Sequence, residues 1–155
     1  MAIGWHFLSE GIGKMKAVHW SAKGYLSGSY GPFSEFFQNM PNYPRFLWFS
    51  DHFVMYGLTL AGILLLLGLF TRLGGALGLG LLVMFYVSYP PWQWMPQPGT
   101  ESNYFLVNKN VIEALGLLAV MAFPTGRFIG FDAVLYPLLA KHCPSWLVGA
   151  PSEEA

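Results

Sequence analysis

The chain has 155 residues, of which 54% are hydrophobic and only 10% are charged, and its mean hydropathy is +0.44. A water-soluble domain carries about 25% charged residues, so this composition excludes an ordinary soluble globule and predicts extensive contact with lipid. Eight basic residues balance eight acidic ones, which excludes nucleic acid as an expected partner. The lone Cys143 excludes an internal disulfide and a cysteine-rich metal centre formed by this chain alone.

The longest apolar segments approach the length of helix that crosses a bilayer core, which is about 20 residues. We expect spans at about 1–16, 46–70, 73–89 and 106–123, the first of them short. The pair Pro90-Pro91 ends the third span, because proline lacks an amide hydrogen and disfavours helix just before it. The sequence therefore predicts an all-α membrane protein, a four-helix transmembrane bundle within a single domain over residues 1–141.

The C-terminal part of the chain does not continue this pattern. Residues 128–140 are apolar but contain Asp132 and Pro137, which favours a helix in the membrane interface over a fifth span. Residues 142–155 are expected to form a tail.

Small residues recur one helical turn apart on the two central spans. Gly74 and Gly78 lie on one of them, and Gly57 and Ala61 lie on the other. Because such positions let backbones approach closely in lipid, they predict tight helix packing.

Ionisable residues inside the predicted spans are the candidates for function, since each costs at least about 2.5 kcal/mol at the membrane centre unless it is paired or buried. His6, Glu10 and Lys14 recur every fourth residue and form one stripe on the first helix. At a rise of about 1.5 Å per residue, we expect Glu10, His52 and Glu113 to share one layer about 9 to 10 Å below one membrane surface. The candidate pocket comprises Glu10, Lys14, Asp51, His52, Tyr86 and Glu113.

Two interpretations of this layer stay open. The charged residues could form a salt-bridged network that fixes the register of the helices. Alternatively, they could line a pocket for a polar headgroup such as that of a quinone, which needs hydrogen-bond donors and a carrier for protons.

The histidines also raise ligation of a haem or another pigment, with His6 and His52 as the candidate ligands. The expected depths of the two residues differ by about 6 Å, which disfavours both binding one metal. A single histidine on a pigment stays open, whereas no other metal site and no covalent cofactor are expected.

The connection over residues 17–45 is rich in aromatic residues and is too long for a simple turn. Such residues favour the headgroup zone of a membrane, so they predict an aromatic belt. A lid over the pocket or a docking surface for a partner is the second interpretation.

Several strings, in their order and spacing, resemble the DoxX/DoxD-like family of small four-helix membrane proteins. They are IGWHFLSEGIGK (3–14), LLGLFTR (66–72), YPP (89–91), NYFLVNKNVIE (103–113) and FPTGR (123–127). The resemblance implies a four-helix membrane subunit, which in the best-known members belongs to a thiosulfate:quinone oxidoreductase. It marks four positions as important: Glu10, Lys14, Arg72 and Glu113. Because family members usually begin the first helix earlier, either the start is truncated or a neighbouring subunit completes that span.

The resulting expectation is an integral, multipass subunit of a redox or energy-transducing complex in the bacterial cytoplasmic membrane, interacting with quinone. Its expected partners are the lipid bilayer and other membrane subunits. The alternative is a non-catalytic accessory subunit that stabilises a larger complex and binds lipid or pigment.

Overall fold

The computed structural model describes residues 1–92, 106–123, 126 and 130–132, and over these residues the chain is helical and contains no strand. The long helices are α1 (Ala2–Lys16), α4 (Pro44–Leu67), α5 (Thr71–Ser88) and α6 (Lys109–Ala122). Three short helices lie between α1 and α4: α2 (Lys23–Ser27), α3 (Ser34–Asn39) and η1 (Met40–Asn42). The long helices coincide with the predicted apolar segments to within three residues at each end.

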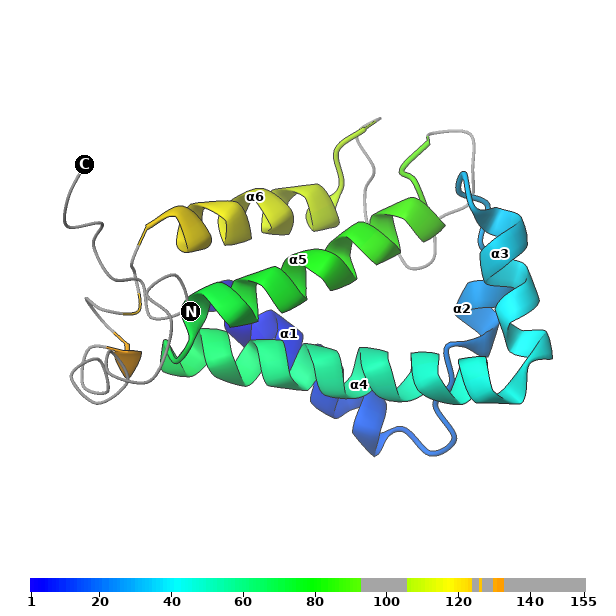
Figure 1. The fold of residues 1–155 in the computed structure, drawn as a ribbon, viewed down its shortest axis with the longest axis horizontal. Helices are drawn as coiled ribbons and strands as arrows, with labels where there is room; N and C mark the ends of the chain where they lie inside the picture. The colour runs from blue at the N-terminus through cyan, green and yellow to red at the C-terminus, as the bar shows by residue number, and fades with distance from the viewer. Residues whose placement is uncertain (93–105, 124–125, 127–129, 133–155) are drawn as a thin grey trace.

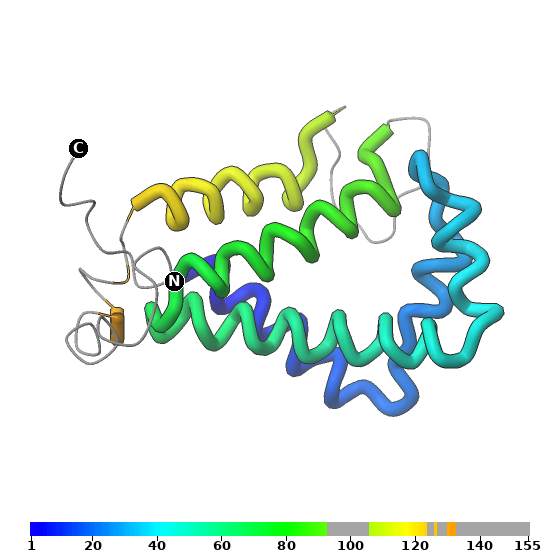
Figure 2. Tube along the Cα trace, viewed as in Figure 1, coloured from blue at the N-terminus to red at the C-terminus, as the bar shows by residue number. Residues whose placement is uncertain are grey.

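The long helices run roughly along the long axis of the molecule (Figure 1). Each packs mainly against its neighbour in the series α1, α4, α5 and α6, and α1 touches α6 over only a short stretch. The short helices α2 and α3 lie steeply across the end where α4 begins and α5 ends, as the tube in Figure 2 shows. We call α2, α3 and η1, with their connections, the end cap.

Local sequence explains where the two central helices begin and end. Pro44 lies in the first turn of α4, where no amide hydrogen is needed. Gly68 ends α4 in a left-handed conformation with φ of 62° and donates its N–H to the Leu64 carbonyl, and Pro90 follows the end of α5. A tight turn between α4 and α5 therefore produces an antiparallel pair.

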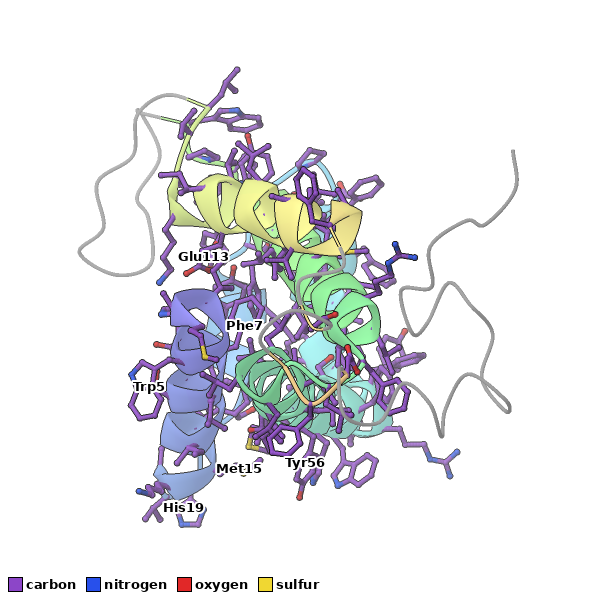
Figure 3. All side chains as sticks on the ribbon, turned by 90° about the vertical axis from the view of Figure 1, so that its left-hand side faces the viewer. Trp5, Phe7, Met15, His19, Tyr56 and Glu113 are labelled. Carbon is purple, nitrogen blue, oxygen red and sulfur yellow. The ribbon has the colours of Figure 1, made fainter. Side chains whose placement is uncertain are left out.

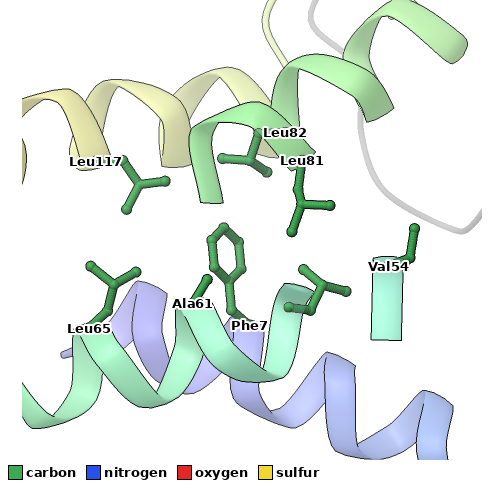
Figure 4. Close-up of a cluster of buried hydrophobic side chains, with 8 residues drawn as sticks. Phe7, Val54, Ala61, Leu65, Leu81, Leu82 and Leu117 are labelled. Carbon is green, nitrogen blue, oxygen red and sulfur yellow. The ribbon is translucent and has the colours of Figure 1, made fainter. Parts of the chain in front are cut away.

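The main core lies where the four long helices meet (Figure 4). Phe7 projects from α1 into its centre and is 1% exposed. Its buried partners come from the other three helices: Val54, Leu58, Ala61, Leu65, Leu81, Leu82 and Leu117. The packing of this one ring thus links α1 to α5 and α6 as well as to α4.

Glycine permits an unusually close approach of α1 to α4. A Cβ atom on Gly4 would lie 2.9 Å from the backbone nitrogen of Leu66, and one on Gly11 would lie 2.7 Å from that of Thr59. From the opposite helix, a Cβ atom on Gly62 would lie 2.7 Å from the Cα of Leu8. The two helices are therefore antiparallel and almost in backbone contact.

Two predicted segments fall largely outside the described residues. Of the expected interfacial helix over 128–140, the structure describes only residues 130–132, and it does not describe the tail over 142–155.

Candidate functional site

A cavity of about 400 Å³ lies between the end cap and the inner faces of the long helices. Its charged lining comes from α1 and α6, and its apolar lining comes mainly from α4, α5 and the end cap. The charged residues are His6, Glu10, Lys14, Lys109 and Glu113. The volume is near the lower end of the range of about 300 to 1,000 Å³ for small-molecule sites.

His6 of α1 and Glu113 of α6 form a pair that lines one side of the cavity. The His6 Nε2 atom lies 3.6 Å from Glu113 Oε1, and the side chains are 34% and 16% exposed. Figure 3 shows Glu113 between α6 and α1, whereas Trp5 points outward from α1. The pair offers a carboxylate and an imidazole to any ligand at this end of the cavity.

The second charged pair lies within α1, one turn nearer the end cap. Lys14 binds the Glu10 carboxylate, and its Nζ lies 5.8 Å from the centre of the Trp20 ring. The predicted stripe of His6, Glu10 and Lys14 therefore faces the cavity as one surface.

The structure brings together only part of the predicted site. Glu10, Lys14 and Glu113 line the cavity, as does His6, which the sequence placed in the same stripe and named as a candidate pigment ligand. Asp51, His52 and Tyr86 do not line it. The structure does not bring His52 to the level of Glu10: Gly11 packs against Thr59 and Leu8 packs against Gly62, which places Glu10 about 12 Å along α4 from His52.

The three outlying residues make local contacts. Asp51 Oδ1 accepts hydrogen bonds from the Ala22 N–H at 2.7 Å and from the Ser21 hydroxyl at 3.2 Å, so it anchors the chain between α1 and α2. His52 stacks on Trp48, with ring centres 4.2 Å apart, and its Nδ1 lies 2.8 Å from the Trp48 carbonyl oxygen. The Tyr86 hydroxyl donates to the Leu106 carbonyl at 3.1 Å.

His6 lines the cavity beside Glu113, whereas His52 packs on Trp48 outside it, which argues against joint ligation of one metal. Among residues 1–92, 106–123, 126 and 130–132, no three His, Cys, Asp or Glu side chains are grouped in a way that could hold a metal ion.

The end cap covers the cavity with an apolar cluster. Ala22, Leu26 and Phe37 are each less than 9% exposed, and all three line the cavity. The aromatic connection that the sequence interpreted as a belt or a lid thus contributes directly to the wall of the site.

Hydrogen bonds hold the end cap onto the end of α5. The Tyr25 hydroxyl donates to the Phe85 carbonyl at 3.2 Å, the Tyr89 hydroxyl donates to the Tyr25 carbonyl at 2.7 Å, and the Ser29 hydroxyl donates to the Ser88 carbonyl at 2.8 Å. Burial, together with the neighbouring Tyr89 and Tyr30 phenols, raises the pKa of Tyr25 above its usual value of 10.0. The protonated phenol is thus the form that the cap stabilises.

The small residues marked in the sequence lie at helix contacts. A Cβ atom on Gly74 would lie 2.9 Å from Leu64 Cβ, one on Gly57 would lie 3.3 Å from Leu81 Cδ1, and one on Gly78 would collide with the Phe7 ring. The sequence interpretation missed Gly4, Gly11 and Gly62, although the spacing of seven residues between the first two was a signal of a common helix face.

Asp132 has a role that sequence reasoning also missed. Its side chain is 2% exposed and accepts hydrogen bonds from the Phe70 N–H at 2.8 Å and from the Thr71 N–H at 3.3 Å. It thereby caps the first turn of α5, the turn that also contains Arg72. Nothing near Asp132 in the sequence identifies this distant partner.

Comparison with known proteins agrees with the resemblance seen in the sequence. The DoxX family model matches residues 1–89, which include α1 to α5 and therefore most of the cavity wall but not α6. No curated protein and no solved structure gives a significant match. Because the family model covers more than half of its length, the chain belongs to the DoxX family, whose members are generally membrane proteins.

Proposed function

We propose that the protein is a multipass subunit of a redox or energy-transducing complex in the bacterial cytoplasmic membrane, and that its cavity binds a quinone. The observation that carries this proposal is the cavity itself, with two pairs of ionisable side chains at one end and apolar walls elsewhere. Ionisable groups beside apolar helices are expensive and are usually functional.

Membrane insertion is supported by the outer surfaces of the helices. Two helices, α4 and α5, are long and apolar enough to cross a bilayer, with mean hydropathies of 1.5 and 1.4, yet only 33% and 39% of their apolar stretches are buried within the chain. The outer face of α6 is also apolar, since Ile112 and Leu115 are 63% and 62% exposed. Lipid around a bundle of all four long helices would cover these faces.

Quinone chemistry explains why imidazole and carboxylate groups would lie together at the charged end. A quinone takes up two protons when it is reduced by two electrons, and its carbonyl oxygens accept hydrogen bonds. His6 could donate such a hydrogen bond to a quinone carbonyl, and Glu113 could exchange a proton with the quinone. The electrons would come from a partner subunit.

A binding titration tests this assignment. Decylubiquinone is added to the protein in lipid nanodiscs, and quenching of tryptophan fluorescence is measured, since Trp20 lines the cavity. Replacing Glu113 with Gln should weaken binding by roughly tenfold or more, because it removes the charge that holds the His6 imidazole, the proposed donor to the quinone carbonyl, in place. The exposed Glu35 in α3 provides the matched control, Glu35→Gln, which should bind as the wild type does. Equal affinity of wild type and Glu113→Gln would contradict the proposed site.

The second candidate function is a non-catalytic accessory subunit that stabilises a larger complex and holds lipid or pigment. The observation that favours it is that Glu10 is already bound by Lys14 and Glu113 by His6, as in a network that fixes helix register. This alternative predicts that Glu10→Gln changes assembly of the native complex, measured by co-purification, without changing quinone reduction. Loss of reduction in an intact complex would exclude it.

A further inference from the structure

The cavity has walls of very different exposure, and this difference indicates how a ligand reaches it. On the side of the end cap, the innermost lining residues are buried: Leu26 is 5% exposed, Phe37 is 8%, Tyr89 is 8% and Ser88 is 1%, whereas Trp20, Ser21, Tyr25 and Met40 are half-buried. The hydrogen bonds from the end cap to α5 fasten this wall. Entry from water at this end would require the cap to detach.

The wall formed by the N-terminal half of α4 is different. Phe49 and Phe53 line the cavity from α4, yet they are 57% and 39% exposed. Their rings are stacked with centres 5.6 Å apart and planes inclined by 16°. We call this exposed part of the wall, formed by Phe49, Ser50 and Phe53, the fork. The fork is apolar, and in the bilayer it would face lipid.

Charge is confined to the opposite side of the cavity. His6, Glu10 and Lys14 on α1 and Lys109 and Glu113 on α6 supply two carboxylates, two ammonium groups and one imidazole. This set is balanced when the imidazole is neutral, so it suits an uncharged polar head better than a phosphate. The cavity therefore has the polarity of an amphiphile, with a polar end on α1 and α6 and an apolar exit at the fork.

We propose that the fork is a lateral portal to the bilayer and that the ligand is a membrane-dissolved amphiphile with an uncharged polar head and an apolar tail that leaves the protein past Phe49 and Phe53. About 400 Å³ accommodates a head and a short part of a tail, so a long tail has to pass through an opening. This inference rests on the proposed function for the identity of the head, but the portal itself can be tested without any quinone.

The test uses a cysteine placed in the cavity. Val54 lines the cavity, is 4% exposed and lies one turn below Ser50 on α4. Val54→Cys is made in a Cys143→Ala background and reconstituted in lipid vesicles. Two maleimides are compared: one that carries an acyl chain and stays in the bilayer, and a sulfonated one that stays in water. Leu82→Cys, from the opposite wall on α5, serves as a second reporter in case the first variant does not fold.

The portal predicts that the bilayer reagent modifies the cysteine faster than the aqueous reagent does. Adding Ser50→Trp should obstruct the fork and slow the bilayer reaction by about tenfold or more, equivalent to about 1.4 kcal/mol of added barrier. The matched control is Ser27→Trp, an exposed serine of α2 that does not line the cavity, and it should leave the rate unchanged. A third variant, Asp51→Ala, releases the end cap from α4 and should also leave the bilayer rate unchanged.

Three results would overturn the inference: faster reaction with the aqueous reagent, acceleration of the aqueous reaction by Asp51→Ala with no effect of Ser50→Trp, or no reaction with either reagent in the folded protein. Failure of decylubiquinone to bind would overturn the proposed quinone function and would leave these labelling rates as they are. The two proposals can therefore fail separately.

Discussion

Replacing Gly62 with alanine tests the contact on which the position of α1 depends. An added Cβ atom would lie 2.7 Å from the Cα and 2.8 Å from the Cβ of Leu8. Because these atoms belong to the α1 backbone or are fixed to it, no side-chain rotation relieves the clash, and α1 as a whole has to move away from α4. Overpacking of this kind costs about 1 to 3 kcal/mol.

A matched substitution isolates that steric cost. Gly80 lies within α5, and a Cβ atom there would meet nothing within 4 Å. Both substitutions gain the higher helix propensity of alanine, which is about 1 kcal/mol in each case, so this gain cancels in the comparison. We therefore expect Gly62→Ala to be about 1 to 3 kcal/mol less stable than Gly80→Ala.

The free energy of unfolding is measured in mixed micelles by titration with sodium dodecyl sulfate, followed by circular dichroism of the helices. Gly80→Ala should be as stable as the wild type or slightly more stable. If Gly62→Ala and Gly80→Ala have the same free energy of unfolding, the close α1–α4 contact does not exist as described.

Two further predictions concern the ends of α5. Asp132→Ala removes the acceptor for the Phe70 and Thr71 amides and should destabilise the first turn of α5 by about 0.5 to 2 kcal/mol, seen as faster hydrogen exchange of those amides; unchanged exchange would contradict the cap. At the other end, burial favours the protonated form of Tyr25, so its contribution to stability is constant below pH 10.0 and is lost as the pH rises above that value. The ultraviolet titration of Tyr25→Phe is subtracted from that of the wild type, and the difference reports Tyr25. Tyr25 should ionise at a higher pH than an ordinary tyrosine does, and ionisation near pH 10.0 would refute its burial.

The helices could be predicted from the sequence because their limits depend on local features. Apolar runs, together with Pro44, Gly68 and Pro90, are sufficient to place α4 and α5 to within three residues. The short helices α2 and α3 were not predicted, because they are only five and six residues long and owe their position to contacts with α4 and α5. Asp132 likewise depends on a partner 61 residues away.

The site was predicted in part, and the error has a definite geometric source. Counting residues inward from an assumed membrane surface gives each helix an independent depth, whereas packing fixes the depths of helices relative to one another. The glycine contacts place Leu8 beside Gly62 and Gly11 beside Thr59, which moves Glu10 away from His52. His6, Glu10 and Lys14, which were predicted to form one stripe, line the same cavity because they belong to one helix.

The direction of the polar stripe could have been inferred from α1 alone. At about 100° per residue, Gly4 and Gly11 project within about 20° of one another, and the centre of the stripe, at Glu10, lies about 110° away from them. If the glycines face α4, as the close contacts show, the stripe cannot also face α4, where His52 lies. The side chain of Phe7 projects between the two directions and enters the core. The stripe must then point past the core to the helix on its other side, which is α6, and Glu113 is the carboxylate that meets it there. The same glycines that hold α1 against α4 therefore determine that the charged end of the cavity is shared between α1 and α6.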